Sequence, residues 1–277
     1  MRAALVQMTS SDDPQANLDA ARGYLQEAAA RGADLVLTPE VTNCVSTSRS
    51  HQNAVLRTED EDPALAALRA EAQAQGLWLL IGSLALKTDD PQDRRFANRS
   101  LLIGPDGAIA ARYDKIHMFD VDVSETETYR ESEGFRPGDR AVLAHTPLAP
   151  IGMTVCYDIR FPHLYRALAQ AGAQILTVPA AFSFETGKAH WETLLRARAI
   201  ETGCFVLAPA QTGTHSAQRG KARTTHGHSI AVAPWGEVLL DAGQSPGVFM
   251  VDLDMTAVQT ARARVPSLRH DRPFAGP

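Results

Sequence analysis

The chain has 277 residues, of which 44% are hydrophobic and 21% charged, so it is long enough for one large α/β domain. Its net charge of −5 argues against a nucleic-acid-binding surface, which needs clustered Lys and Arg. No segment approaches the roughly 18 consecutive apolar residues of a membrane span. Three cysteines without CxxC spacing favour neither a disulfide framework nor a structural zinc site. We therefore expect a protein that binds neither nucleic acid nor membrane.

The first half of the chain alternates short apolar runs with amphipathic stretches of helical length. The pattern predicts strands at 2–7, 34–38 and 77–81, and helices at 14–31 and 63–75. A Pro near the start and a Gly after the end mark both helices. A Gly-Pro-Asp-Gly stretch at 104–107 between two apolar runs predicts a hairpin. Because the chain begins as a strand rather than as a leader peptide, we expect a cytoplasmic protein.

The second half repeats this alternation. It predicts strands at 151–155, 174–178 and 204–209, helices near 162–171 and 189–202, and a strand-rich tail. Segments 32–39 and 172–179 match in length and type, each running from Gly through a strand to Pro. Two similar halves could stack their sheets face to face, although helix–Gly–strand units look alike in any α/β protein. Both interpretations predict an α/β fold whose connections return to a sheet.

Cys156 stands where the apolar run 151–155 ends and a polar turn begins. A strand that runs into a turn and then a helix lifts its last side chain out of the sheet. The nearby helix start would also favour the thiolate form, so the position suits a nucleophile. The alternative is a small buried hydrophobe, the commonest role of a free Cys.

Two charged residues follow other predicted strands. Glu40 comes directly after Pro39 at the carboxyl end of a buried strand, where open α/β sheets place their ligands. Lys115 follows the hairpin and puts a long cation into a strand-like stretch. Surface Glu and strand-edge Lys are both common, so neither residue alone indicates a site.

Together, Glu40, Lys115 and Cys156 resemble the catalytic triad of the carbon–nitrogen hydrolase (nitrilase-like) superfamily. The contexts at 39–40, 113–117 and 155–162 carry the resemblance, and the motifs at 189–192, 195–201, 227–229 and 234–236 extend it over nearly the whole chain. The resemblance implies a single carbon–nitrogen hydrolase domain over residues 1–277, folded as a four-layer αββα sandwich. That fold would also explain the two matching Gly-to-Pro segments.

The resemblance implies a mechanism for these side chains. Cys156 attacks an amide carbon, Glu40 moves the thiol proton to the leaving nitrogen, and Lys115 faces the developing oxyanion. The backbone N–H of Tyr157 would be a second oxyanion donor. Glu131 matches the family's additional carboxylate, which holds the lysine; the alternative is a solvated loop Glu. Ammonia leaves, water hydrolyses the thioester, and neither a metal nor an organic cofactor is needed.

The motifs are most similar to the Nit branch of this superfamily. Its members hydrolyse the amide of deaminated glutathione or the terminal amide of 2-oxo-dicarboxylic monoamides, the ω-amidase substrates. The segment at 208–213 favours the first substrate and that at 115–120 suits the second, while N-carbamoyl and aliphatic amides are further alternatives. Both main substrates carry a remote carboxylate, which Arg160 could bind bidentately. A structural pairing of Arg160 with Asp158 is equally consistent with the sequence.

Other function classes are less well supported by the sequence. A zinc hydrolase would have only His226 and His228 as a close pair, without an HExxH motif. A redox thiol protein could use Cys44 as a resolving partner, although the simplest role of Cys44 is to line the same cleft. A catalytically silent scaffold would have lost a triad member, and none is lost.

The sequence also predicts self-association. The apolar residues of the helix around 191–199 and of the tail at 248–253 are more than one sandwich should expose. We therefore expect at least a homodimer.

Overall fold

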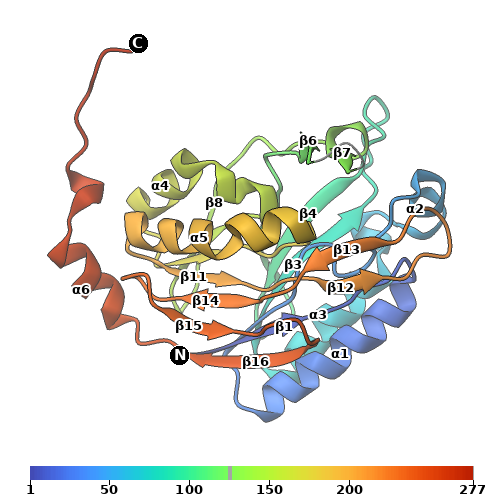
Figure 1. The fold of residues 1–277 in the computed structure, drawn as a ribbon. Helices are drawn as coiled ribbons and strands as arrows, with labels where there is room; N and C mark the ends of the chain where they lie inside the picture. Colours follow the sequence, from blue (N-terminus) through green and yellow to red (C-terminus); the bar gives the residue numbers. More distant parts are fainter. Residues whose placement is uncertain (124–126, 277) are drawn as a thin grey trace.

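The computed structural model describes residues 1–123 and 127–276, and two six-stranded sheets form its centre (Figure 1). The first sheet has the order β16-β1-β2-β3-β4-β5, with β1 (Arg2–Gln7), β2 (Leu35–Leu37), β3 (Trp78–Leu86), β4 (Ala97–Ile103), β5 (Ile109–Asp114) and β16 (Gly247–Asp252). The second has the order β15-β14-β11-β10-β9-β8, with β8 (Val142–His145), β9 (Pro150–Met153), β10 (Ile175–Thr177), β11 (Phe205–Ala208), β14 (Ile230–Val232) and β15 (Val238–Asp241).

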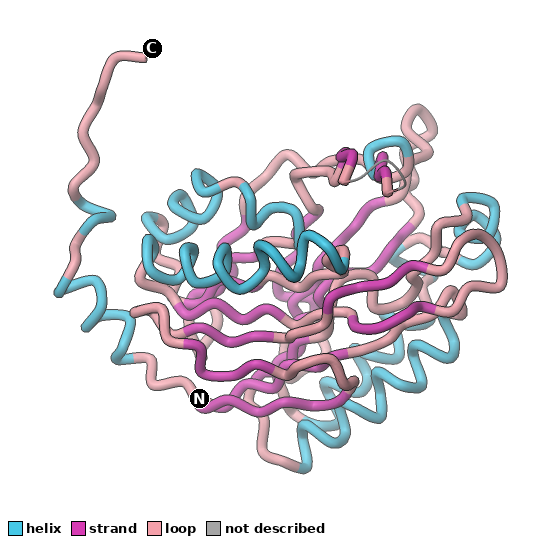
Figure 2. The backbone as a smooth tube through the Cα atoms, in the orientation of Figure 1, coloured by secondary structure: helices cyan, strands magenta, loops and turns pink. Residues whose placement is uncertain are grey.

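Helices cover the outer faces of the two sheets (Figure 2). The first sheet is covered by α1 (Pro14–Ala30) and α3 (Pro63–Gln75), and the second by α4 (Pro162–Gln170) and α5 (Phe184–Thr202). The predicted four-layer αββα sandwich is thereby confirmed. None of the helices in residues 1–123 and 127–276 is long and apolar enough to cross a membrane.

Smaller elements lie around this sandwich. They are α2 (Arg49–Val55), α6 (Thr256–Arg264), the hairpin-like pairs β6 (Asp120–Asp122) with β7 (Thr128–Arg130) and β12 (Thr212–His215) with β13 (Arg223–His226), and the 3-10 helices η1 (Glu59–Glu61), η2 (Glu131–Glu133), η3 (Cys156–Arg160) and η4 (Ser267–Arg269). After α6 the chain extends away from the sandwich (Figure 1).

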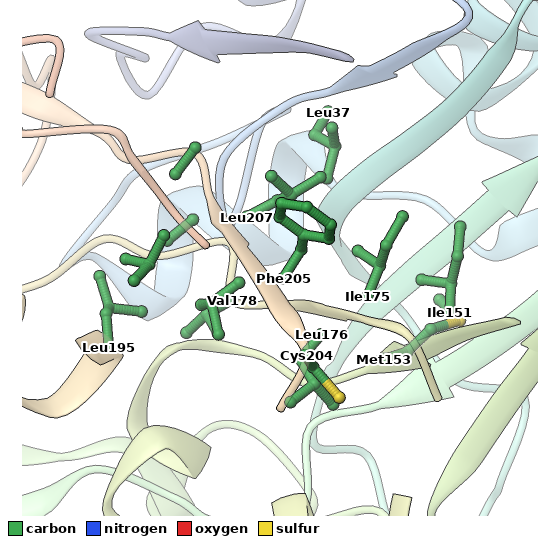
Figure 3. Close-up of a cluster of buried hydrophobic side chains, with 14 of the residues drawn as sticks. Leu37, Ile151, Met153, Ile175, Leu176, Val178, Leu195, Cys204, Phe205 and Leu207 are labelled. Atoms are coloured by element: carbon green, nitrogen blue, oxygen red, sulfur yellow. The ribbon is translucent and has the colours of Figure 1, made fainter. Parts of the chain in front are cut away.

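Strand β2 shows how the layers are held together. It pairs in parallel with β1 and β3, and all three of its residues are apolar and buried because both faces of the strand are covered. Val36 belongs to the cluster under α1 and α3, whereas Leu35 and Leu37 belong to the core shared with the second sheet. Figure 3 shows Leu37 in this core together with Phe205 of β11.

The two matching segments of the sequence contain equivalent strands. Just as β2 lies between two parallel neighbours, β10 pairs in parallel with β9 and β11. Segments 32–39 and 172–179 therefore carry central strands of the two stacked sheets. This arrangement agrees with the interpretation of two similar halves packed face to face.

Two sequence predictions need correction. The long helix begins at Phe184, five residues earlier than predicted, and the tail contains the helix α6 as well as strands. Of the apolar residues that suggested a dimer, Trp191, Leu195 and Val251 are buried within the chain, whereas Leu194 and Phe249 are only partly buried. The burial of the first three weakens this argument for self-association, and the homodimer stays a prediction.

Candidate active site

Three strand ends meet at one cavity of about 580 Å³. Glu40 lies three residues after β2, Lys115 directly after β5, and Cys156 three residues after β9. All three side chains line the cavity, together with Glu131 and Tyr157. Of the six site residues predicted from the sequence, these five line the cavity, and Arg160 does not.

A buried lysine joins two carboxylates in this cavity. The Nζ atom of Lys115 lies 2.9 Å from Oε1 of Glu40 and 2.9 and 2.8 Å from the two carboxylate oxygens of Glu131. The lysine side chain is only 2% exposed. A buried ammonium needs such compensation, because an unpaired charge is strongly disfavoured away from water. Glu131 is therefore part of the cluster and not a solvated loop residue.

Asn98 on β4 was not recognised from the sequence. Its Nδ2 donates to Oε1 of Glu40 at 2.9 Å and to Oε1 of Glu131 at 3.3 Å, so it links the same two carboxylates as Lys115. Its Oδ1 is buried and has no hydrogen-bond partner among the described residues. Its own neighbourhood gave no clear signal, because Arg99 and Ser100 follow it in the same strand.

The backbone around Cys156 presents its thiol. Cys156 has a φ of 49°, which is unusual for a residue other than glycine, and begins the 3-10 helix η3. Its N–H donates to the carbonyl of Pro179 at 2.9 Å, which fixes the turn to the end of β10. The N–H of Tyr157 lies in the first turn of η3, where backbone donors have no carbonyl earlier in the helix to bind.

Asp158 connects the cysteine turn with the strand that carries the lysine. Its buried carboxylate accepts from Val155 N at 2.8 Å, from the Tyr113 hydroxyl at 2.6 Å and from His117 Nδ1 at 2.7 Å. Tyr113 and His117 flank Lys115 in the sequence. The carboxylate thus couples the positions of Lys115 and Cys156, and its three partners do not include Arg160.

Arg160 lies beside the cavity and not in it. Within the described residues, the lining includes Tyr157 and Phe182 but not Arg160. The guanidinium carbon lies 5.5 Å from the ring centre of Phe182 and 5.8 Å from that of Tyr157. Its Nη2 is 3.3 Å from Nδ1 of His190. Arg160 therefore supports two aromatic wall residues, and its binding of a substrate carboxylate stays a prediction.

Opposite charges keep Glu40 ionised. Burial alone would raise the pKa of Glu40, but the charge and hydrogen bond of Lys115, together with the charge of Arg223, lower it below the ordinary value. For Lys115, burial works against the charged form, but Glu131 and Glu40 outweigh it and raise the pKa. The resting cluster thus contains a carboxylate and an ammonium in direct contact.

The thiol of Cys156 has the opposite tendency. Burial raises its pKa well above the ordinary thiol value, and the charge and hydrogen bond of Glu40 raise it further, while Lys115 opposes the change. The prediction that a helix start favours thiolate at this position is therefore wrong. A protonated thiol beside an ionised carboxylate is the arrangement that a general base requires.

The remaining cysteines and the histidine pair have different surroundings. Cys44 lines the cavity as expected, and burial with the nearby Asp12 raises its pKa to about 12. Cys204 is buried elsewhere. His226 and His228 stack at 4.6 Å between ring centres, outside the cavity lining. The described residues contain no group of three or more His, Cys, Asp or Glu that could hold a metal ion.

The sequence of this chain matches the carbon-nitrogen hydrolase family model over residues 2–263. The chain therefore belongs to the carbon-nitrogen hydrolase family. It is 40% identical over 273 residues to the deaminated glutathione amidase of Yersinia enterocolitica, a match that covers 97% of this chain and 92% of that protein. With amidases of this similarity among its relatives, it is a cysteine-dependent amidase, a hydrolase of carbon–nitrogen bonds other than peptide bonds.

Solved structures have the same fold. The Caenorhabditis elegans NitFhit protein superposes with a TM-score of 0.88 at 35% identity over 98% of this chain, which spans 65% of that longer chain. A mutant of the amidase from Nesterenkonia sp. AN1 has a TM-score of 0.77 at 30% identity, covering 96% of this chain and 98% of that one. That structure shows the result of Michael addition of acrylamide at the active-site cysteine of the Nesterenkonia enzyme.

Proposed function

We propose that this amidase hydrolyses a small carboxylate-bearing amide with Cys156 as nucleophile, Glu40 as general base and acid, and Lys115 as the cation facing the oxyanion. The observation that carries the proposal is the contact of Glu40 with Lys115, 2.9 Å apart, in the cavity that Cys156 also lines, where burial and Glu40 raise the pKa of the thiol. Such a thiol becomes nucleophilic only when a base removes its proton during attack.

The first half of the reaction forms a thioester. The sulfur of Cys156 bonds to the amide carbon as Glu40 takes the thiol proton, and the oxygen gains negative charge. Lys115 and the N–H of Tyr157 stabilise that charge. The carbon–nitrogen bond then breaks as Glu40 returns the proton to the leaving nitrogen. Glu131 keeps Lys115 charged throughout, because it pairs with the ammonium whether or not Glu40 is protonated.

The second half consumes one water molecule. Glu40, ionised again, removes a proton from water as the oxygen attacks the thioester carbon. The carbon–sulfur bond breaks, the thiol regains its proton from Glu40, and the carboxylic acid leaves. Each cycle therefore needs only the substrate and water, and we expect no cofactor to be required.

We favour deaminated glutathione as the substrate, since the curated relatives at 37–40% identity include enzymes named for it. Its scissile amide is secondary, so the leaving amine is a dipeptide and not the ammonia expected from the sequence, whereas a 2-oxo-dicarboxylic monoamide does release ammonia. Both substrates give a 2-oxo-dicarboxylate as the acid product. A cavity of about 580 Å³ lies in the range that holds molecules of this size.

A substrate panel tests this proposal. Purified protein is incubated with deaminated glutathione, 2-oxoglutaramate, 2-oxosuccinamate, N-carbamoyl-β-alanine, an aliphatic amide and a nitrile, and both ammonia and released amine are measured. We expect the highest kcat/KM for deaminated glutathione, with cysteinylglycine as product and no loss of activity on chelation. A higher value for a 2-oxo monoamide would identify an ω-amidase. No turnover of any compound would indicate a silent scaffold.

We also propose that the protein forms at least a homodimer in the cytoplasm. The support for pairing is an exposed apolar group, Ile200, Trp235 and Val265, which lines a hollow of about 500 Å³ by α5 and α6. A reducing compartment suits a mechanism that depends on a free thiol. Light scattering at micromolar concentration is expected to give at least twice the monomer mass, and a monomer mass alone would contradict pairing.

A further inference from the structure

Arg223 brings a cation to the cavity from a part of the chain that sequence reasoning did not single out. It is the first residue of β13 and lines the cavity. Its Nη2 donates to the carbonyl of Ala181, and the N–H of Ala181 donates to Oε2 of Glu40 at 2.8 Å. One residue thus separates the guanidinium from the proposed general base. The positive charge of Arg223 also contributes to the low pKa of Glu40.

Arg223 retains donor capacity that the protein does not use. Its Nε is buried and has no hydrogen-bond partner in the described part of the chain. Among the described ion pairs, none includes Arg223. The other two arginines of the lining also have partners within the protein. Arg130 pairs with Asp122 at 2.8 Å, and Arg49 donates to the Gly134 carbonyl at 3.0 Å and lies over the Phe96 ring.

The segment before Arg223 is fixed to the first half of the chain. The N–H of Gln218 donates to Oδ2 of Asp12 at 2.7 Å, and that of Lys221 donates to Oγ1 of Thr47 at 3.0 Å. The Tyr129 ring lies 5.5 Å from the guanidinium carbon. These contacts hold the guanidinium in a defined place, so it can bind a ligand without first being ordered.

Building on the amidase function proposed above, we propose that Arg223 binds the carboxylate that both candidate substrates carry in their acyl half. A guanidinium binds a carboxylate through two parallel hydrogen bonds, which fixes the position of the bound group as well as its charge. The enzyme thereby selects amides with an anionic group a few atoms from the scissile carbonyl. This assignment competes with the one that the sequence predicted for Arg160, which lies beside the cavity and not in its lining.

The test compares two substrates that differ in this charge and in one methyl group. 2-Oxoglutaramate and its neutral methyl ester have the same scissile amide and nearly the same length. Arg223→Gln is expected to lower kcat/KM for the anion by about 10- to 100-fold, the effect of a lost charged hydrogen bond, mainly through KM. The ester should lose less than about threefold. Arg223→Lys keeps the charge but loses the two-pronged geometry and should give an intermediate loss on the anion.

Two further variants make the result decisive. Arg22→Gln, a half-exposed arginine of α1 that pairs with Glu71, is the surface control and should change neither substrate. Arg160→Gln tests the competing anchor. Equal losses on both substrates in Arg223→Gln would show that the residue acts only through Ala181 and Glu40, and would overturn the proposal. A loss selective for the anion in Arg160→Gln, with none in Arg223→Gln, would overturn it too.

Binding without turnover separates this proposal from the proposed reaction. In a Cys156→Ala background, calorimetry with 2-oxoglutarate, the shared acid product, measures binding of an acyl half that carries the remote carboxylate, without turnover. We expect the additional Arg223→Gln substitution to weaken binding by about 10-fold or more. An unchanged Kd would contradict the assignment even if hydrolysis proceeds as proposed. Weakened binding combined with an inactive wild-type protein would instead reject the reaction and retain the anion site.

Discussion

The two strand ends at Pro39 and Pro179 have similar sequences and equivalent places in the two sheets, but they contribute to the cavity in different ways. The first is followed by Glu40, whose side chain enters the cluster with Lys115. The second is followed by two alanines and contributes backbone groups only. The carbonyl of Pro179 accepts from Cys156 N at 2.9 Å, and the N–H of Ala181 donates to Glu40 at 2.8 Å. The strand end at Pro39 thus supplies a reactive side chain, and the strand end at Pro179 holds it in place.

Gly82 of β3 allows these two strand ends to approach each other. A Cβ atom at this position would lie 2.0 Å from the carbonyl oxygen of Thr38 and 2.5 Å from Cβ of Pro179. Only a residue without a side chain fits between them. The second strand end therefore acts through the path of its backbone, and small side chains are sufficient there.

Substitutions at the two strand ends should differ most in their effect on kcat. Glu40→Gln should fold but lose two to four orders of magnitude in kcat, because an amide cannot act as the general base. Ala181→Gly keeps the backbone N–H and should lose less than about tenfold. Steady-state kinetics of both variants measure the difference. Similar losses in the two would contradict the division between a reactive side chain and a holding backbone.

The next effect concerns the contact between the strand ends. Gly82→Ala should lower the free energy of unfolding by about 1–3 kcal/mol or more, the usual cost of overpacking, and should reduce activity by displacing Glu40. Gly23→Ala in the middle of α1 is the matched control, since a Cβ there meets no atom within 4 Å. This control should gain about 0.5–1 kcal/mol. Denaturant unfolding compares them, and equal stabilities would argue against the close approach.

The smallest effect is a dependence of stability on pH. Burial lowers the pKa of His215 to about 4, and its ring nitrogens contact the carbonyl of Ser10 and Oγ1 of Thr225 at 2.7 Å each. Because the folded pKa lies below the unfolded value of about 6.5, the unfolded chain binds more protons between these values. Stability should therefore fall as the pH drops from 6.5 to 4 and level off for this group below 4. A flat free energy of unfolding over this window would contradict a buried neutral His215.

Much of this arrangement could be predicted from the sequence where local patterns decide it. Helix α3 has its predicted limits because Pro63 and Gly76 mark its two ends. Glu40, Lys115 and Cys156 were found as ends of apolar runs and as a family resemblance, and Glu131 through that resemblance alone. These are features that a short stretch of sequence contains.

The other residues of the site depend on contacts between distant segments. Asn98 and Arg223 reach the cavity because β4 and β13 pass it, and nothing in their own sequence neighbourhoods indicates this. The protonated state of Cys156 also depends on burial and on Glu40, which lies more than a hundred residues away. The helix-start argument used only local structure, and it gave the wrong sign for the pKa shift.

The most direct test of the central claim is a search for the covalent intermediate. Working enzyme is quenched rapidly and digested, and each cysteine peptide is weighed by mass spectrometry. We predict a mass increase equal to the acyl part of the substrate on the Cys156 peptide alone, more abundant in Glu40→Gln if water activation slows more than attack. Cys156→Ala should show neither adduct nor hydrolysis, and Cys44→Ser and Cys204→Ser should retain most activity. An adduct on Cys44, or undiminished hydrolysis by Cys156→Ala, would contradict the account.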